Sequence, residues 1–242
     1  MERVKNIHLI LSKEKLQFRL YLLISLAVCL LSLIIINSEV QSYIRFFGPV
    51  NPLLVIIGSI VIGFFLFIYL LSSTSLKIYN QRNHKGILFS SVLAFLFGLE
   101  VIAADIWIIN YPPDINIPFP TSLIFYPTIC FVAEIIFHLL PLSLIIIILR
   151  VVSKGIRYHW VMLIAIILVS ISEPLYQVIV MGIRSHYSQT TLIYTGLHVF
   201  LLSFSQLLIF RKYDFISMFT LRLVYYLIWH IIWGYLRLDI LF

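Results

Sequence analysis

The amino-acid sequence predicts an all-α fold, namely a polytopic transmembrane helix bundle of about seven spans. Of the 242 residues, 62% are hydrophobic and 11% are charged, a composition that is far too apolar for a soluble domain. Several apolar runs are longer than the roughly 18 residues that mark a spanning helix. Loops rich in Lys and Arg alternate along the chain with loops that are poor in them, as in multi-pass membrane proteins.

The chain divides into a short polar segment and one helical domain. Residues 1–16 are polar and basic, and we expect them to form a cytoplasmic N-terminal segment. The first apolar run is too long for the hydrophobic region of a cleavable signal, so we interpret it as an anchor. Residues 17–242 are predicted to form a single transmembrane helical domain. Its spans are expected at about 17–37, 52–71, 87–110, 121–149, 159–182, 190–210 and 216–238.

The basic residues predict the orientation of the bundle. Thirteen Lys and Arg lie in the N-terminal segment and in the loops after spans two, four and six. Three lie in the other loops, namely Arg45, Arg184 and Arg237, and Arg222 falls just inside span seven. Because cytoplasmic loops carry an excess of Lys and Arg, we expect the N-terminus inside and the C-terminus outside. The net charge of +7 is therefore a sign of topology and not of nucleic-acid binding.

Span four contains the most informative pair of residues. Glu134 and His138 are four positions apart in an otherwise apolar run, so a helix places them on one face. An ionisable group within a membrane span is costly, and its default interpretation is a functional site facing other helices or a water-filled cavity. Pro141 follows the pair and Pro174 follows Glu173 in span five, so a helix kink is expected at both places.

Ionisable residues from five predicted spans fall at a similar depth. With a rise of about 1.5 Å per residue, they lie on the order of 12 to 25 Å below the outer membrane surface. Each one alone could be a polar contact between helices, and Glu100 in particular could serve as a structural partner. Together, carboxylates and imidazoles are the types that bind a metal, activate water or relay protons. The members of this layer are Glu100, Glu134, His138, Glu173, His198 and His230.

Two short motifs resemble a known family. The segment AEIIFH ends at His138 and is similar to E-E-x-x-x-R, with Ala133 and His138 in place of the first Glu and the Arg. The segment WHIIWG begins at Trp229 and is similar to H-x-x-x-N, with Gly234 in place of Asn. These motifs resemble those of the CPBP (Abi) family of intramembrane proteases, which includes the type II CAAX prenyl endopeptidases. The resemblance covers roughly residues 125–237, so a protease-like core is expected at about 121–238.

The third family motif, F-x-x-x-H, has two possible placements in this chain. VSISE, which ends at Glu173, has suitable spacing. YTGLH, which ends at His198, matches the pattern better and would move the first motif to SEPLYQ at residues 172–177. The resemblance implies an endopeptidase in which a glutamate activates water, with Glu134 as first choice for the base and His138 beside it. It implies that His230, with Glu173 or His198, polarises the carbonyl group or binds a metal. The candidate catalytic residues are Glu134, His138, Glu173 and His230, and the candidate ligands of a divalent metal such as zinc are Glu173, His198 and His230.

Other function classes stay open at this point. A non-enzymatic membrane subunit or immunity protein, as a degenerate relative, would need only structural polar contacts. A proton-coupled transporter could use the same residues, although it usually contains an inverted repeat, which the sequence does not show. We expect an integral, multi-pass protein of a prokaryotic plasma membrane. Its expected partners are the lipid bilayer and a peptide or membrane-protein substrate.

Overall fold

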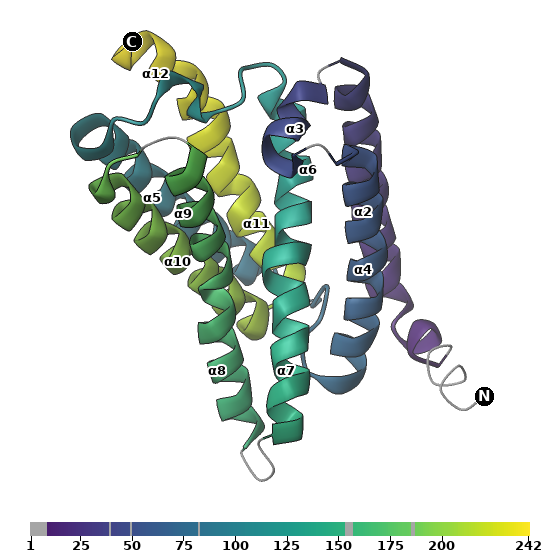
Figure 1. The fold of residues 1–242 in the computed structure, drawn as a ribbon. Coiled ribbons are helices and arrows are strands. Elements are labelled where there is room, and N and C mark those ends of the chain that lie inside the picture. Colours follow the sequence, from purple (N-terminus) through teal and green to yellow (C-terminus); the bar gives the residue numbers. More distant parts are fainter. Residues whose placement is uncertain (1–8, 39, 49, 82, 153–156, 185–186) are drawn as a thin grey trace.

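The structure is a computed structural model that describes residues 9–38, 40–48, 50–81, 83–152, 157–184 and 187–242. Within these residues all regular elements are helical, which confirms the all-α prediction (Figure 1). Seven helical stretches are long and apolar enough to cross a membrane, in agreement with the predicted number of spans. They are Lys15–Ile34, Pro52–Ser73, His84–Ile109, Ser122–Val152, Tyr158–Val180, Gln189–Lys212 and Phe215–Leu241.

Several spans are built from more than one helical segment. The α-helices are α2 (Lys15–Ser38), α3 (Val40–Phe47), α4 (Pro52–Ser73), α5 (His84–Ala104), α6 (Ser122–Ala133), α7 (Leu140–Val152), α8 (Tyr158–Ser170), α9 (Ser172–Arg184), α10 (Gln189–Lys212), α11 (Phe215–Tyr226) and α12 (Gly234–Leu241). Three π-helical segments continue these spans, namely η1 (Asp105–Ile109), η3 (Glu134–Leu139) and η4 (Leu227–Trp233), and η2 (Pro113–Ile115) is a short 3-10 turn.

Both predicted kinks coincide with an irregularity in the helix. In span four the π-helical η3 ends at Leu139, two residues before Pro141. Span five is interrupted at Ile171, where α8 ends and α9 begins just before Pro174. Proline cannot donate a backbone hydrogen bond, so the preceding turn must find another arrangement. Each irregular segment lies next to an ionisable residue, His138 in span four and Glu173 in span five.

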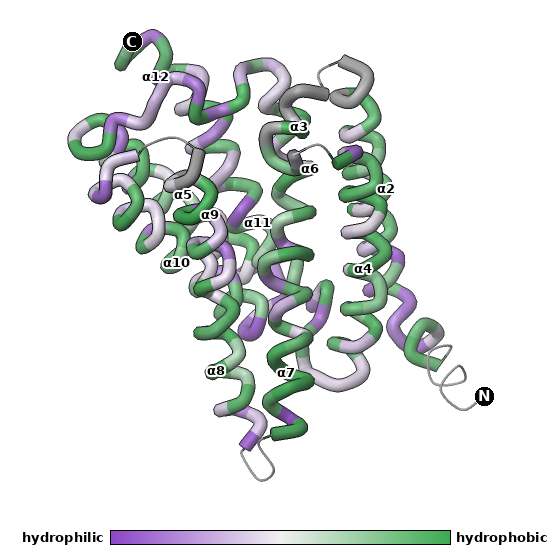
Figure 2. The backbone as a smooth tube through the Cα atoms, viewed as in Figure 1, coloured by the Kyte–Doolittle hydropathy of each residue, from purple (hydrophilic) through white to green (hydrophobic). Residues whose placement is uncertain are grey.

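Span seven lies at the centre of the bundle. Half of its most apolar window is buried, compared with about a third for each of the first five spans. Figure 1 shows α11 behind α6 and α7 and beside α5 and α10. Hydrophobic residues dominate the middle of the helices, and hydrophilic residues gather mainly toward the two ends (Figure 2). Large apolar side chains that remain exposed, such as Leu54, Phe65 and Leu88, fit a bilayer environment.

At the end of the bundle near the N-terminus, the capping residue of α11 connects the loop after span two to span seven. Asp214 caps α11 by accepting a hydrogen bond from the backbone N–H of Ser217 at 2.7 Å. Its second oxygen accepts from the backbone N–H of Asn80 at 2.8 Å. The N–H of Phe215 donates to the carbonyl of Lys77 at 3.0 Å. The loop after span two is therefore fixed to the start of span seven.

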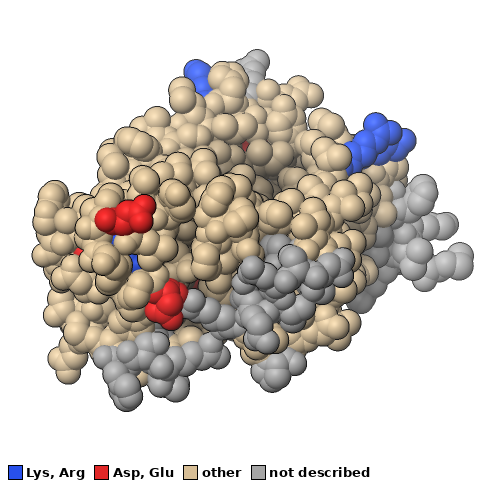
Figure 3. Space-filling model, turned by 90° about the horizontal axis from the view of Figure 1, so that it is seen from above, with Lys and Arg blue, Asp and Glu red and all other residues tan. Residues whose placement is uncertain are grey.

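The opposite end contains the C-terminus, α3, α12 and the loop between spans three and four (Figure 1). Seen from above, this face is mostly uncharged (Figure 3). Arg237 lies at this end but is fully buried. The side chains of Arg45 and Arg184, which the topology count also places here, lie outside the described residues. The N-terminus inside orientation remains a prediction from the charge distribution.

Candidate functional site

The π-helical segments carry ionisable residues in three of the seven spans. Asp105 begins η1, Glu134 and His138 lie in η3, and His230 lies in η4. A π-helical turn contains one more residue than an α-helical turn, so it changes the direction of the side chains that follow it. Such turns occur frequently at functional sites. The irregular backbone thus coincides with the polar residues that the sequence singles out.

Arg222 on α11 joins two of these residues from different spans. Its side chain is almost completely buried, with a relative exposure of 1%. Nη1 and Nη2 donate to the two carboxylate oxygens of Glu173, at 2.6 and 2.5 Å. Nε donates to Oε1 of Glu134 at 2.6 Å. One guanidinium group therefore links spans four, five and seven, and the bidentate pair with Glu173 fixes its orientation.

Other polar side chains form hydrogen bonds with the carboxylates of Glu134 and Glu173. Oε2 of Glu134 lies 2.6 Å from Nδ1 of His138, and the amide of Gln206 donates to Oε1 of Glu134. Ser203 and Gln177 donate to Glu173 at 3.3 and 3.2 Å. All four carboxylate oxygens accept hydrogen bonds. We call Glu134, His138, Glu173, Gln206 and Arg222 the Arg222 cluster.

The Arg222 cluster contains two carboxylates, one guanidinium group and one imidazole. Two ionised carboxylates face one guanidinium group, which leaves one negative charge when His138 is neutral. Nε2 of His138 is buried and has no hydrogen-bond partner among the described residues. It lies 3.9 Å from Oε2 of Glu173. A proton on this nitrogen would therefore be directed toward the second carboxylate.

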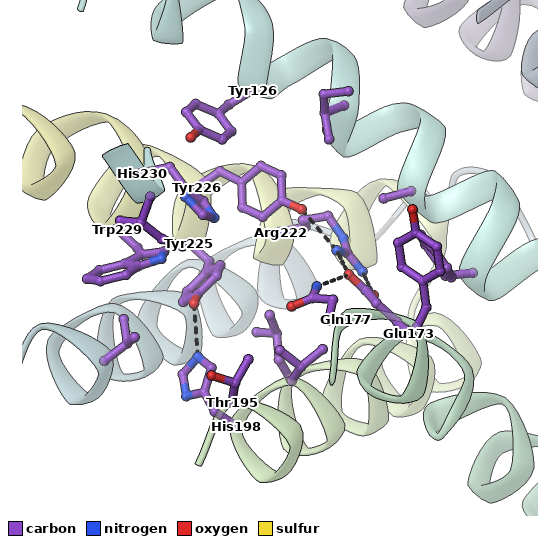
Figure 4. A pocket seen from close by; sticks show the side chains of 18 of the residues that line it. Tyr126, Glu173, Gln177, Thr195, His198, Arg222, Tyr225, Tyr226, Trp229 and His230 are labelled. Carbon is purple, nitrogen blue, oxygen red and sulfur yellow. Dashed lines mark hydrogen bonds and ion pairs between the residues drawn. The ribbon is translucent and has the colours of Figure 1, made fainter. Parts of the chain in front are cut away.

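Beside the Arg222 cluster lies a cavity of about 330 Å³ (Figure 4). Residues of spans three to seven line it, together with the loop after span three and with Phe46 of α3. Its polar and aromatic lining consists of Phe46, Tyr111, Tyr126, Phe137, Glu173, Tyr176, Gln177, Tyr187, Thr195, His198, Arg222, Tyr225, Tyr226, Trp229 and His230. An apolar cavity with a few convergent polar groups is the usual form of a small-molecule or substrate site.

His230 is held in one orientation at the cavity wall. Its Nδ1 lies 2.6 Å from Oδ1 of Asn116, so Nδ1 carries the proton and donates to the amide oxygen. The imidazole stacks on Tyr126 with a centroid distance of 4.4 Å, and it meets Tyr226 edge-on at 4.8 Å. Among the described residues no group bonds to Nε2. This nitrogen is left with a free lone pair.

Asn116 occupies the space beside the last motif. A Cβ atom placed on Gly234 would lie 3.0 to 3.2 Å from the side chain of Asn116. The resembling family motif has Asn at this position of the helix. In this protein the loop after span three places the side-chain amide of Asn116 in the same region. This amide forms a hydrogen bond with the imidazole of His230, the first residue of the motif.

A second hydrogen-bonded chain connects residues of spans three, six and seven. Nδ1 of His198 lies 2.5 Å from Oε2 of Glu100, and Nε2 lies 2.9 Å from the hydroxyl of Tyr225. Tyr194 also donates to Glu100, at 2.9 Å. Glu100 therefore has polar partners on span six, as its structural interpretation requires. Its partners are Tyr194 and His198.

The predicted catalytic residues come together only in part. Glu134, His138 and Glu173 meet around Arg222, whereas His230 lies beyond Tyr226, whose hydroxyl accepts from Arg222 at 3.2 Å. Glu173 and His230 line the cavity, but Glu134 and His138 do not. At the position of the first motif Glu, the methyl group of Ala133 lines the cavity instead. The first-choice base thus points into an ion-pair network and away from the cavity.

The predicted metal ligands share the cavity but not a coordination centre. Glu173, His198 and His230 all line it. Each is engaged elsewhere, with Arg222, with Glu100 and Tyr225, and with Asn116, respectively. Within the described part of the chain, no three His, Cys, Asp or Glu side chains form a group that could hold a metal ion. These residues therefore do not fit a shared metal as they are arranged, and zinc stays a prediction.

Sequence reasoning missed Arg222 as the centre of the site. In the sequence Arg222 is a basic residue just inside span seven, and a guanidinium group within a span requires carboxylate partners on other spans. Arg222, Tyr226 and His230 recur every four residues, which places them along one side of span seven. That spacing was the available signal. No sequence pattern indicates the hydrogen bond between His230 and Asn116, because the loop that carries Asn116 is irregular.

No family model, curated protein or solved structure matches the chain.

Proposed function

We propose that this protein is a membrane-embedded endopeptidase that cleaves a peptide bond within the cavity, with His230 as the general base. The observation that carries this proposal is the fixed imidazole at the cavity wall. Asn116 holds the proton on Nδ1, so the lone pair of Nε2 is available to a water molecule. The resemblance of spans four to seven to intramembrane proteases supports the choice of a peptide substrate.

The chemistry requires one base and one hydrogen-bond donor to the carbonyl oxygen. Nε2 of His230 takes a proton from water while the water oxygen attacks the carbonyl carbon. The carbonyl oxygen becomes an oxyanion and accepts a hydrogen bond from Tyr226, whose hydroxyl is polarised by Arg222 at 3.2 Å. His230 then returns the proton to the amide nitrogen as the C–N bond breaks. Atoms and protons balance without an additional group.

Glu134 and Glu173 have a positioning role in this scheme. Because all four of their oxygens already accept hydrogen bonds, neither carboxylate is free to activate water in this arrangement. They hold Arg222, and Arg222 holds the hydroxyl of Tyr226. The general base assigned to Glu134 from the sequence therefore moves to His230, which faces the cavity.

A second candidate function is a non-enzymatic membrane subunit that binds a ligand in the same cavity. Ala133 favours it, because this side chain lines the cavity where the resembling motif has a carboxylate. The pairing of Glu134 and Glu173 with Arg222 favours it as well, because paired carboxylates are typical of a structural contact between spans. In this alternative the Arg222 cluster is a structural joint between spans.

Cells that express the protein and its His230→Gln variant can distinguish the two functions. We expect new peptide termini of membrane proteins, detected by terminal labelling and mass spectrometry, with the wild-type protein. Their rate of formation should fall about 10²- to 10⁴-fold in His230→Gln, the usual loss when a general base is removed. His159→Gln serves as a matched control, because His159 is exposed and contacts Arg211 at the other end of the bundle.

The melting temperature in detergent separates catalysis from folding in the same experiment. His230→Gln should melt within a few degrees of the wild type, because glutamine can still bond to Asn116. Identical sets of termini in wild-type and His230→Gln cells would contradict the endopeptidase proposal and favour the binding subunit.

A further inference from the structure

Glu100 is a carboxylate on the outside of the bundle at membrane depth. Its side chain is 50% exposed. Its neighbours Leu96 and Leu99 are also exposed, so this side of α5 is the side that a bilayer would cover. Glu100 lies nine residues before the end of the span at Ile109, or roughly 14 Å along the helix axis. An ionisable side chain is rarely placed in contact with lipid at this depth, and its default interpretation is a functional role.

Hydrogen bonds connect Glu100 to the cavity in one direction. Ionised Glu100 can only accept, so Nδ1 of His198 donates to it at 2.5 Å. Nε2 of neutral His198 can then only accept, and the hydroxyl of Tyr225 donates to it at 2.9 Å. His198 and Tyr225 both line the cavity. The chain therefore runs from the cavity wall to the lipid-facing surface without interruption.

We propose that Glu100, His198 and Tyr225 form a proton relay that exchanges protons between the cavity and the lipid-facing surface of the bundle. The Tyr225 hydroxyl proton moves to Nε2 of His198 as the Nδ1 proton moves to the Glu100 carboxylate. The Tyr225 oxygen takes a proton from hydronium or a protonated ligand group in the cavity. One proton enters at Tyr225 and one arrives at Glu100. The relay goes beyond the proposed peptidase and does not depend on peptide cleavage.

Other polar groups near the relay are already engaged. On α10, Tyr194 donates to Glu100, and Thr195 shares a hydrogen bond of 2.8 Å with the hydroxyl of Tyr111. Asp105, further along the same span as Glu100, is paired with Arg237. The edge-on ring of Phe97 packs against His198. Glu100 is thus the exposed acid at the end of this chain.

Dicyclohexylcarbodiimide tests the relay without any knowledge of the substrate. This lipid-soluble reagent adds to protonated carboxyl groups. We expect mass spectrometry of the protein in phosphatidylcholine vesicles to find the adduct on Glu100, with a yield that falls as the pH rises through the range in which Glu100 ionises. Glu134 and Glu173 should remain unlabelled as internal controls, because both are buried and paired with Arg222. The variant Glu100→Gln should lose the adduct.

The coupling to the cavity is tested with Tyr225→Phe. The Tyr225 hydroxyl makes the Nδ1 proton of His198 a stronger donor, and this stabilises ionised Glu100 two hydrogen bonds away. Its removal should move the pH midpoint of Glu100 labelling upward by roughly half a pH unit. Tyr176→Phe is the matched control. It removes another cavity hydroxyl from a residue that makes no bond to the chain, and the midpoint should not change.

The variant His198→Gln completes the test. In the background of His198→Gln, the Tyr225→Phe substitution should have no further effect on the midpoint, because the connection is already broken. If Tyr225→Phe does not fold, His198→Gln alone must move the midpoint upward. Absence of the Glu100 adduct at every pH, or a wild-type midpoint in the folded Tyr225→Phe variant, would overturn the relay.

Discussion

Arg222 is the residue on which the geometry of the site depends. Its guanidinium group makes hydrogen bonds to carboxylates from two other spans and is almost completely buried. In a low-dielectric interior, one buried cation between two carboxylates is stabilised mainly by those partners. Its loss would leave two carboxylates in contact without a compensating charge.

We therefore expect Arg222→Leu to lower the free energy of unfolding by about 3 to 5 kcal/mol, the usual cost of breaking a buried ion pair. Thermal unfolding in detergent measures this effect as a lower melting temperature. Arg211→Leu is the control, because Arg211 is a partly exposed residue near the end of α10. Replacement of Glu134 and Glu173 by Gln together with Arg222→Leu should recover part of the loss. Equal melting temperatures for Arg222→Leu and wild type would show that the cluster does not stabilise the fold.

The sequence predicted that acids and imidazoles of different spans lie at one depth, but it did not predict which residues they contact. Glu134, His138 and Glu173 were expected in one layer, and they meet. The sequence could not show that Glu134 turns toward Arg222 while Ala133 faces the cavity. Adjacent residues on a helix differ by about 100° in direction, so the choice depends on how span four rotates against its neighbours.

Among the elements, the three π-helical segments and one loop position the site. Asp105 in η1 accepts from Arg237 at 2.8 and 3.0 Å, from Trp233 at 2.8 Å and from the N–H of Tyr111 at 2.9 Å. Arg237 also donates to the carbonyls of Tyr111 and Pro112. These hydrogen bonds of Asp105 and Arg237 fix the loop that places Asn116 beside His230.

We expect Asp105→Asn to loosen that loop. An asparagine amide places N–H groups against the donors of Arg237 and leaves the buried guanidinium without a negative partner. Hydrogen exchange of residues 110–116 should become about ten- to a hundredfold faster, which corresponds to a loss of roughly 1 to 3 kcal/mol. Asp239→Asn, which changes an exposed carboxylate on the same helix as Arg237, is the control. Unchanged exchange in Asp105→Asn would show that the loop is held by other contacts.

Helices and their number were predictable, because a backbone in lipid must satisfy its own hydrogen bonds and apolar runs of sufficient length can only be helical. The π-helical turns were not predictable from the sequence. Their extra residue is accommodated by tertiary packing, and the hydrophobic pattern of η3 and η4 resembles that of an ordinary α-helix. Pro141 and Pro174 indicated where helices deviate, but not how.

For the whole molecule, the central feature is a cavity inside an otherwise apolar bundle. Span seven contributes Arg222, Tyr226 and His230 to it, and this span is the most buried of the seven. The described Lys and Arg that are exposed lie mainly toward the end of the bundle opposite the C-terminus, consistent with the predicted orientation. Hydrolysis and proton relay both require that water reaches the cavity.

Water access is tested most directly by the thiol reactivity of Ala133→Cys in a Cys29→Ser background. Ala133 lines the cavity next to the Arg222 cluster, whereas Ile135 is fully buried and packs toward Gly63, so Ile135→Cys is the control. A water-soluble methanethiosulfonate reacts with the thiolate, so its rate reports water at the thiol. A wet cavity predicts that Ala133→Cys reacts at least about tenfold faster than Ile135→Cys. Equal, slow reaction of both thiols would contradict a water-filled cavity and with it the proposed chemistry.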